Sequence, residues 1–110
     1  MSIPHASSGE IINIRPLGEA LKTTRSSTLI RASHLEVFRL ILPAGKTTHE
    51  HRAAGAITIQ CLEGRVEFQA HGQTQILQTG DLVYLSDAQP HDVLAIEDTA
   101  LLITLQLHRE

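Results

Sequence analysis

Apolar residues in this chain occur in short runs that are separated by Gly, Pro and small polar residues. The runs lie at 10–15, 27–31, 34–42, 56–62, 65–71, 74–78, 82–85, 91–96 and 100–107. Several runs alternate with a period of two: Ile57, Ile59 and Cys61 fall on one face of their run, and polar residues fall on the other. Such alternation predicts half-buried β-strands, whereas no run carries the apolar stripe of a long helix.

These runs predict an all-β domain of antiparallel strands. About eight short strands at roughly 8–12-residue spacing, with Gly and Pro between them, are typical of a sandwich or barrel. Residues 17–24 are expected to form one helical turn or an irregular link, and Gly72-Gln73 is expected to turn the chain. A chain of 110 residues is one domain, which we divide into an N-terminal arm (1–24) and a single barrel (25–110).

Composition and charge exclude several classes of protein. The net charge is −3, the nine basic residues are scattered, and only 3% of residues are aromatic, so a nucleic-acid partner is not expected. No apolar run is long enough to span a membrane, and the N-terminus lacks a signal region, so we expect a cytoplasmic protein. The single cysteine, Cys61, excludes a disulfide framework and is expected to be a small buried hydrophobe.

Seven residues are histidines, and three of them stand out by position. His49 and His51 are two residues apart, shortly after a Pro-Ala-Gly turn, and His91 follows Pro90 at the start of another run. Residues i and i+2 of an extended segment point the same way, so two imidazoles are positioned to reach one ion. The remaining histidines are expected at the surface: His5, His34, His71 and His108.

The chain resembles the small single-domain cupins of the RmlC-like type in two motifs. The first cupin motif runs Gly, five residues, His-x-His, three or four residues, Glu, six residues, Gly. Gly45 and Gly64 hold the two ends of this motif in register here. His51 then falls on the first His, Ala53 on the second His and Ile57 on the Glu.

The second cupin motif runs Gly, five residues, Pro-x-Gly, two residues, His, three residues, Asn. Gly80 and His91 have this spacing. Ser86 falls on the Pro, Ala88 on the Gly and Ala95 on the Asn. The resemblance, which covers roughly residues 35–105, implies a double-stranded β-helix, the jelly-roll barrel of the cupins.

The resemblance implies a reduced set of metal ligands. Metal-binding cupins use three His and one Glu, and here only His51 and His91 occupy ligand positions, with His49 as a substitute for a third. One interpretation is therefore a site of His49, His51 and His91 for a single divalent ion (Zn, Fe, Mn or Ni), completed by water or substrate. A second is a metal-free pocket in which His51 and His91 are the catalytic, acid–base or hydrogen-bonding groups. A third is a purely structural role.

Both functional interpretations predict a pocket for a small organic molecule. The pocket would belong either to an enzyme of the oxygenase, isomerase or decarboxylase type or to a binding or sensor module without turnover. We expect a homodimer, because dimerisation covers edge strands and because the arm of many small cupins pairs with a partner subunit. Glu63 is expected to do no more than precede a turn, and Glu50, Gln60, Tyr84 and Asp92 are expected outside the site.

Overall fold

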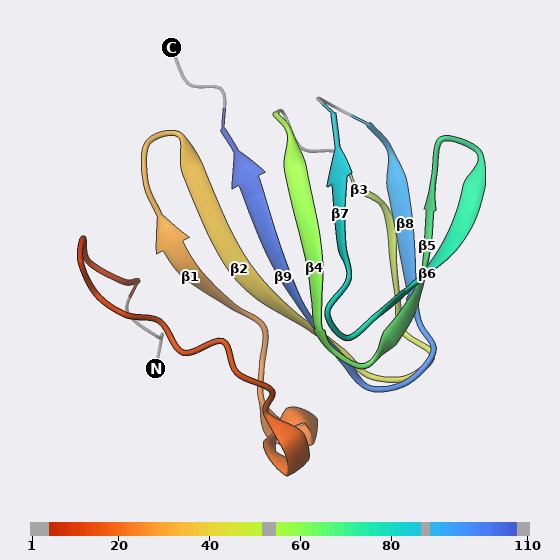
Figure 1. Ribbon diagram of the computed structural model, residues 1–110, viewed down its shortest axis with the longest axis horizontal. Helices are drawn as coiled ribbons and strands as arrows, with labels where there is room; N and C mark the ends of the chain where they lie inside the picture. Colours follow the sequence, from red (N-terminus) through yellow and green to blue (C-terminus); the bar gives the residue numbers. More distant parts are fainter. Residues whose placement is uncertain (1–4, 52–54, 87–88, 108–110) are drawn as a thin grey trace.

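The computed structural model describes residues 5–51, 55–86 and 89–107, with the backbone alone at 49–51 (Figure 1). The described residues form nine strands and one short 3₁₀ helix. In chain order these are η1 (Gly18–Thr23), β1 (Ser27–Arg31), β2 (Leu35–Leu42), β3 (Thr47–His51), β4 (Ile57–Glu63), β5 (Arg65–Ala70), β6 (Gln73–Gln78), β7 (Leu82–Leu85), β8 (His91–Ala95) and β9 (Thr99–Gln106).

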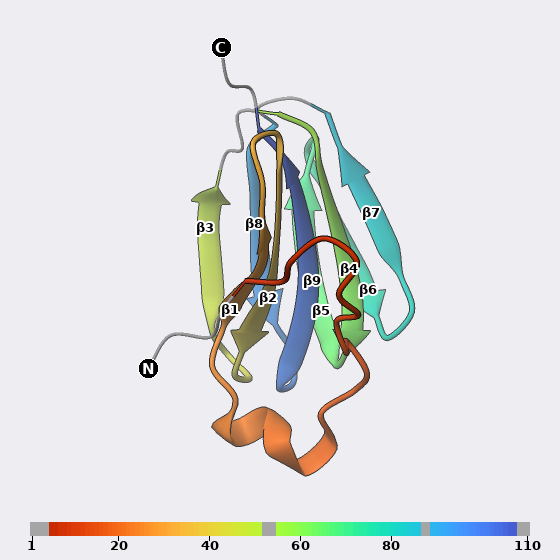
Figure 2. The ribbon, with the colours of Figure 1, turned by 90° about the vertical axis from the view of Figure 1, so that its left-hand side faces the viewer.

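The strands form two antiparallel sheets, which confirms the predicted all-β class. One sheet has the order β1-β2-β9-β4-β7 and the other has the order β3-β8-β5-β6. The two sheets face each other, meet at one end of the molecule and diverge toward the other (Figures 1 and 2). A barrel with one open end results, and β3 and β8 lie in the same wall.

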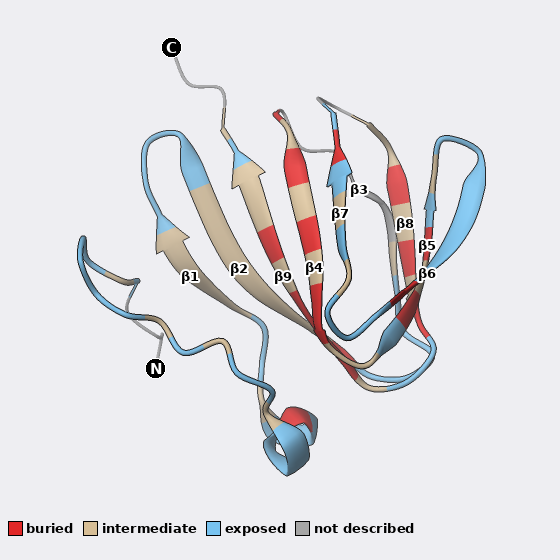
Figure 3. Ribbon diagram, viewed as in Figure 1, coloured by how far each residue is buried: buried red, intermediate tan, exposed pale blue. Residues whose placement is uncertain are grey.

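The core lies between the two sheets, where alternate residues of each strand point inward. In β4, Ile57, Ile59 and Cys61 are buried as predicted, and in β5 the same holds for Val66 and Phe68. Figure 3 shows buried positions as bands along β4, β8 and β9. The apolar residues that alternate in the sequence are therefore the ones that line the packed interior.

Two turns depend on backbone conformations that favour glycine. Gly64 joins β4 to β5 with a φ of +99°, and a Cβ at this position would overlap the carbonyl oxygen of Asp98. The β5–β6 turn is His71-Gly72, with φ values of +53° and +73° between the paired residues Ala70 and Gln73. The predicted turn is wrong by one residue, because a two-residue hairpin of this kind needs positive φ at both central positions.

The segment before β1 packs on the closed end of the barrel. Its 3₁₀ helix, η1, fits the first of the two forms expected for this stretch, and Leu21 of η1 is buried against Leu62 and Ala100. The carboxylate of Glu63 accepts hydrogen bonds from the backbone N–H groups of Leu17 (2.8 Å) and Gly18 (2.9 Å). The prediction that Glu63 only precedes a turn is therefore wrong, since it holds the N-terminal segment to the barrel.

No helix within the described ranges is both long and apolar enough to cross a membrane.

Candidate functional site

The site begins with the pairing of β3 and β8, which brings two of the predicted histidines to the same level of one sheet. Thr48 pairs with Val93, and His51 pairs with His91. The side chains of His49 and His51 lie outside the described residues, so their roles as metal ligands stay predictions.

The register of β3 shifts by one residue between these two pairs. Three steps along β3, from Thr48 to His51, correspond to two steps along β8, from Val93 to His91. Uninterrupted pairing would have placed Glu50 opposite His91. Because an irregularity of this kind breaks strict alternation, the i, i+2 argument for a shared face of His49 and His51 no longer follows from spacing alone.

His91 begins β8 and is only 5% exposed. Its Nδ1 lies 3.2 Å from the backbone carbonyl oxygen of Gln89. A carbonyl oxygen only accepts, so Nδ1 is the donor in this contact, and Nε2 is the other ring nitrogen. The ring of Phe68 lies beside the imidazole, with ring centres 6.1 Å apart and planes inclined by 33°. The backbone and Phe68 together fix the tautomer and the orientation of His91.

An interior cavity of about 180 Å³ opens beside His91. Apolar side chains from both sheets make most of its wall: Phe38, Leu40, Ile57, Ile59, Val93 and Ile103. Thr48 and His91 are the polar residues of the described lining. A small apolar space with few polar groups is the usual form of a site for a small organic molecule.

Ile57 lines this cavity at the position where the cupin motif has Glu, and it is 3% exposed. An aliphatic side chain cannot coordinate a metal ion. Among the described residues that line the cavity, His91 is the side chain of a type that commonly does so. Among residues 5–48, 55–86 and 89–107, no three His, Cys, Asp or Glu side chains gather as a metal site would require. A metal site with three protein ligands in this barrel would therefore need at least one side chain outside the described residues.

The other polar candidates lie away from the interior cavity. Tyr84 is 65% exposed on β7, and Gln60 alternates with the buried residues of β4. Asp92 follows His91 in β8, and neighbouring residues of a strand point to opposite faces. Cys61 is fully buried, as predicted, and its thiol donates to the carbonyl oxygen of Gly64 at 3.4 Å. Burial raises the pKa of this thiol, which suits a packing residue rather than a nucleophile.

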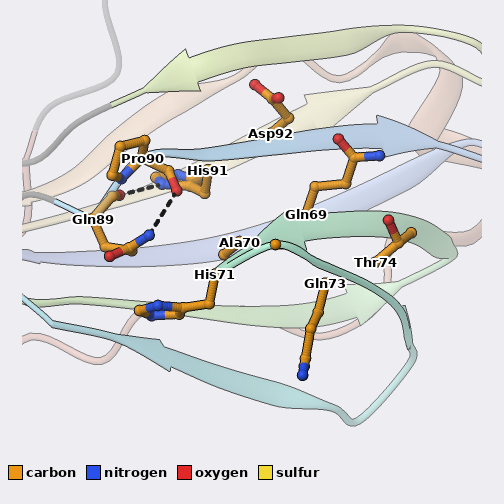
Figure 4. A pocket seen from close by; sticks show the side chains of 10 residues that line it. Gln69, Ala70, His71, Gln73, Thr74, Gln89, Pro90, His91 and Asp92 are labelled. Atoms are coloured by element: carbon orange, nitrogen blue, oxygen red, sulfur yellow. Dashed lines mark hydrogen bonds between the residues drawn. The ribbon is translucent and has the colours of Figure 1, made fainter.

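A second hollow, which sequence reasoning missed, also has His91 in its lining. It is an open cleft of about 510 Å³ between the β5–β6 turn and the residues that lead into β8 (Figure 4). Its polar lining includes Gln69, His71, Gln73, Thr74, Gln89 and Asp92. The residues come from two separate stretches of the chain, 69–74 and 89–92, so no local sequence signal marks the cleft. His91 is the residue that lines both this cleft and the interior cavity.

Comparisons with known proteins agree with this architecture. Residues 38–105 match the family described as the cupin domain. No curated protein is significantly similar to the chain in sequence.

Solved structures with the same fold include three of similar length. A conserved protein of unknown function from Streptococcus pyogenes has 17% identity and a TM-score of 0.75, over 100% of this chain and 97% of that one. A cupin superfamily protein from Desulfitobacterium hafniense has 14% identity and a TM-score of 0.77, over 94% and 100%. An RmlC-like cupin with a double-stranded β-helix fold from Methanocaldococcus jannaschii has 16% identity and a TM-score of 0.72, over 91% and 94%. Similarity at this level shows the fold alone.

Proposed function

The chain belongs to the cupin family, and we propose that its barrel binds a small organic molecule, with His91 and His51 as polar anchors. The observation that carries the proposal is the backbone register, which pairs His51 with His91 beside an apolar cavity. Residues directly opposite each other in an antiparallel pair have Cβ atoms about 4.5–5.5 Å apart. Two imidazoles on one face at this separation are able to hold one ligand atom or to share one proton.

The environment of His91 supports a binding or acid–base role. Burial among apolar side chains strengthens each hydrogen bond that the ring makes to a ligand. The Gln89 carbonyl oxygen fixes the proton on Nδ1, so Nε2 is the atom that accepts a proton or a hydrogen bond. An imidazole whose Nδ1 donates to the backbone presents Nε2 as the nitrogen that acts on a bound molecule, with or without turnover.

The proposed site has two forms, one with a divalent ion and one without. His49, His51 and His91 would supply three nitrogen ligands to Zn, Fe, Mn or Ni and leave a position open to substrate. Ile57 favours the metal-free form, because the buried aliphatic side chain takes the place of a charge-balancing carboxylate.

The test compares three single variants of the untagged protein. We expect His51→Ala and His91→Ala to lower the affinity for pocket ligands by at least tenfold, while the melting temperature stays near that of the wild type. His34→Ala is the matched control, because His34 is exposed and distant in sequence from the pair. Metal content is measured by mass spectrometry on the same samples, before and after addition of Fe, Mn, Zn or Ni.

Two results would contradict the proposal. Unchanged ligand binding in both variants would remove the anchor role, and unfolding of both variants without any loss of binding would make the histidines structural. Stoichiometric metal that disappears in His51→Ala would select the metal-bound form. Absence of metal after addition, with ligand binding intact, would select the metal-free form.

A further inference from the structure

Strand β6 is an exposed edge that is suited to pairing with another strand. It ends one side of its sheet, and β5 is its partner among the strands that the structure describes. Its sequence, Gln-Thr-Gln-Ile-Leu-Gln, carries no charge and no proline, and its pairing with β5 runs without a bulge from Gln73 to Gln78. All of its residues except Leu77 are exposed, including Ile76. Edge strands are usually protected by Lys, Pro, a bulge or a covering segment, and β6 itself has none of the first three.

The hydrogen bonds at the end of β6 show which of its backbone groups face outward. Successive residues of a strand direct their N–H and C=O groups to opposite sides, so alternate residues of an edge strand face away from the sheet. The N–H of Gln78 donates to the Asp81 carboxylate, and its C=O accepts the N–H of Asp81, both at 2.9 Å. Gln78 therefore directs its groups away from β5. By the same alternation, Thr74 and Ile76 also direct theirs to the free edge.

The outward groups of Thr74 and Ile76 fit a second copy of the chain that is related by a two-fold axis at Gln75. Antiparallel pairing about Gln75 places Thr74 of one copy opposite Ile76 of the other. Each such pair exchanges two hydrogen bonds, so every outward N–H and C=O of both residues is satisfied. A register centred on Ile76 would instead need the groups of Gln78, which already bond to Asp81.

The side chains are compatible with this register. On one face it sets the β-branched side chains of Thr74 and Ile76 beside each other, and on the other face Gln75 meets its own copy. A carboxamide both donates and accepts, so two glutamines are able to bond to each other. The register also brings the β5–β6 turn of the second copy, which carries His71, alongside the turn that carries Asp81. An imidazole beside a carboxylate is a complementary pair.

A larger contact than β6 is available on the same side of the molecule. Specific interfaces bury roughly 1,200–2,000 Å² in total, which is more than two short strands supply. Figure 2 shows β7, the free edge of the other sheet, on the same side as β6. Leu82 and Tyr84 of β7 are exposed and are positioned to add apolar area to a contact on this side.

We propose that β6 is the interface at which two copies of this chain pair, antiparallel about Gln75, into one sheet with four strands from each copy. The occupant is a second copy rather than a long foreign strand, because the β5–β6 turn and the bonds of Gln78 to Asp81 limit the free edge to residues 74–76. The inference is independent of the proposed function, since β6 contributes nothing to the described lining of the interior cavity.

Cysteines at two neighbouring glutamines test the register. Gln75→Cys places a thiol at the axis, where opposite residues of a non-hydrogen-bonded pair have Cα atoms about 4.5 Å apart, within the disulfide range of about 4.4–6.8 Å. We expect mild oxidation to give a covalent dimer on non-reducing gels. Gln73→Cys is the matched control, because it is exposed on the same face but opposes Leu77 rather than its own copy, and it should form at least fivefold less dimer. Cys61 is fully buried and does not compete.

Analytical ultracentrifugation of untagged full chain gives the second measurement. Gln75→Lys sets like charges directly opposite each other, so it should raise the dissociation constant of the dimer roughly fivefold relative to Gln73→Lys. Ile76→Pro removes one outward donor from each copy and leaves the bonds to β5 in place. It should raise the dissociation constant at least tenfold, while the melting temperature stays near that of the wild type.

Four results would overturn the proposal. A wild type that stays monomeric at every accessible concentration would remove the interface. Equal cross-linking of Gln75→Cys and Gln73→Cys would remove the two-fold register at Gln75. A dimer that withstands both Ile76→Pro and Gln75→Lys would place the contact on another surface. A monomer that binds unrelated extended peptides in competition with Ile76→Pro would make the edge a peptide-docking site instead.

Discussion

The bond between Glu63 and the N-terminal segment gives the sharpest prediction about stability. Its carboxylate accepts two backbone N–H groups, from Leu17 and Gly18, one with each oxygen. Hydrogen bonds to a charged acceptor contribute roughly 1.5–3 kcal/mol each when they are shielded from water. The Gly18 bond is exposed and the Leu17 bond is only partly buried, so solvent reduces both contributions.

We expect Glu63→Ala to lower the free energy of unfolding by about 2 kcal/mol, and Glu63→Gln by about 1 kcal/mol. The amide keeps one accepting oxygen, so it retains one of the two bonds. Loss of both bonds also loosens the contact that Leu21 of η1 makes with Leu62 and Ala100. The N-terminal segment would then detach in part before the barrel unfolds.

Urea unfolding followed by circular dichroism measures these differences, and hydrogen exchange at the amides of Leu17 and Gly18 locates them. Glu67→Ala is the matched control, because Glu67 is a half-buried glutamate of β5, in the other sheet from Glu63. The reasoning is refuted if Glu63→Ala stays within about 0.5 kcal/mol of the control, which is the usual range for surface substitutions.

Three further predictions follow from the core and the edges. Phe68→Ala should destabilise the protein by about 3–5 kcal/mol, because Phe68 is 2% exposed; thermal unfolding measures the change, and a loss below about 1 kcal/mol would contradict full burial. Burial raises the pKa of Cys61, so the folded state keeps a proton that the unfolded state loses as the pH passes the ordinary pKa of a thiol. Stability should therefore fall with rising pH above that value, with a smaller slope in Cys61→Ala; equal slopes in urea titrations would exclude this contribution. We also expect a homodimer in which exposed Leu82 and Tyr84 of edge strand β7 are covered, so that Tyr84→Lys shifts the light-scattering mass from two chains toward one; a monomeric wild type would refute this.

The alternating strands were predictable because the polarity of each residue indicates whether its side chain faces the core or the solvent. In β4 and β5 the period of two fixes which side chains are buried, and the motif glycines Gly64 and Gly80 end strands where the chain turns. Burial of Cys61 follows from the same alternation. These features depend on local pattern and on backbone conformations that few residues adopt.

Features that depend on the relation between distant segments were not predictable. The bond from Glu63 to the N-terminal segment joins residues 46 positions apart, and nothing near Glu63 in the sequence marks it. The cleft likewise combines the β5–β6 turn with the start of β8. The residue opposite His91 also depends on a register shift, and single-strand spacing does not reveal such a shift.

That shift makes the chemistry at the open end of the barrel a matter of strand alignment as well as of residue type. If β3 slipped by one position, His91 would face Glu50, and a carboxylate–imidazole pair would replace two imidazoles. Removal of one residue between Thr48 and His51 would instead keep the histidine pair and straighten the strand. A one-residue change of register in β3 is thus enough to exchange a pair of imidazoles for an imidazole beside a carboxylate, with the sequence of β8 unchanged.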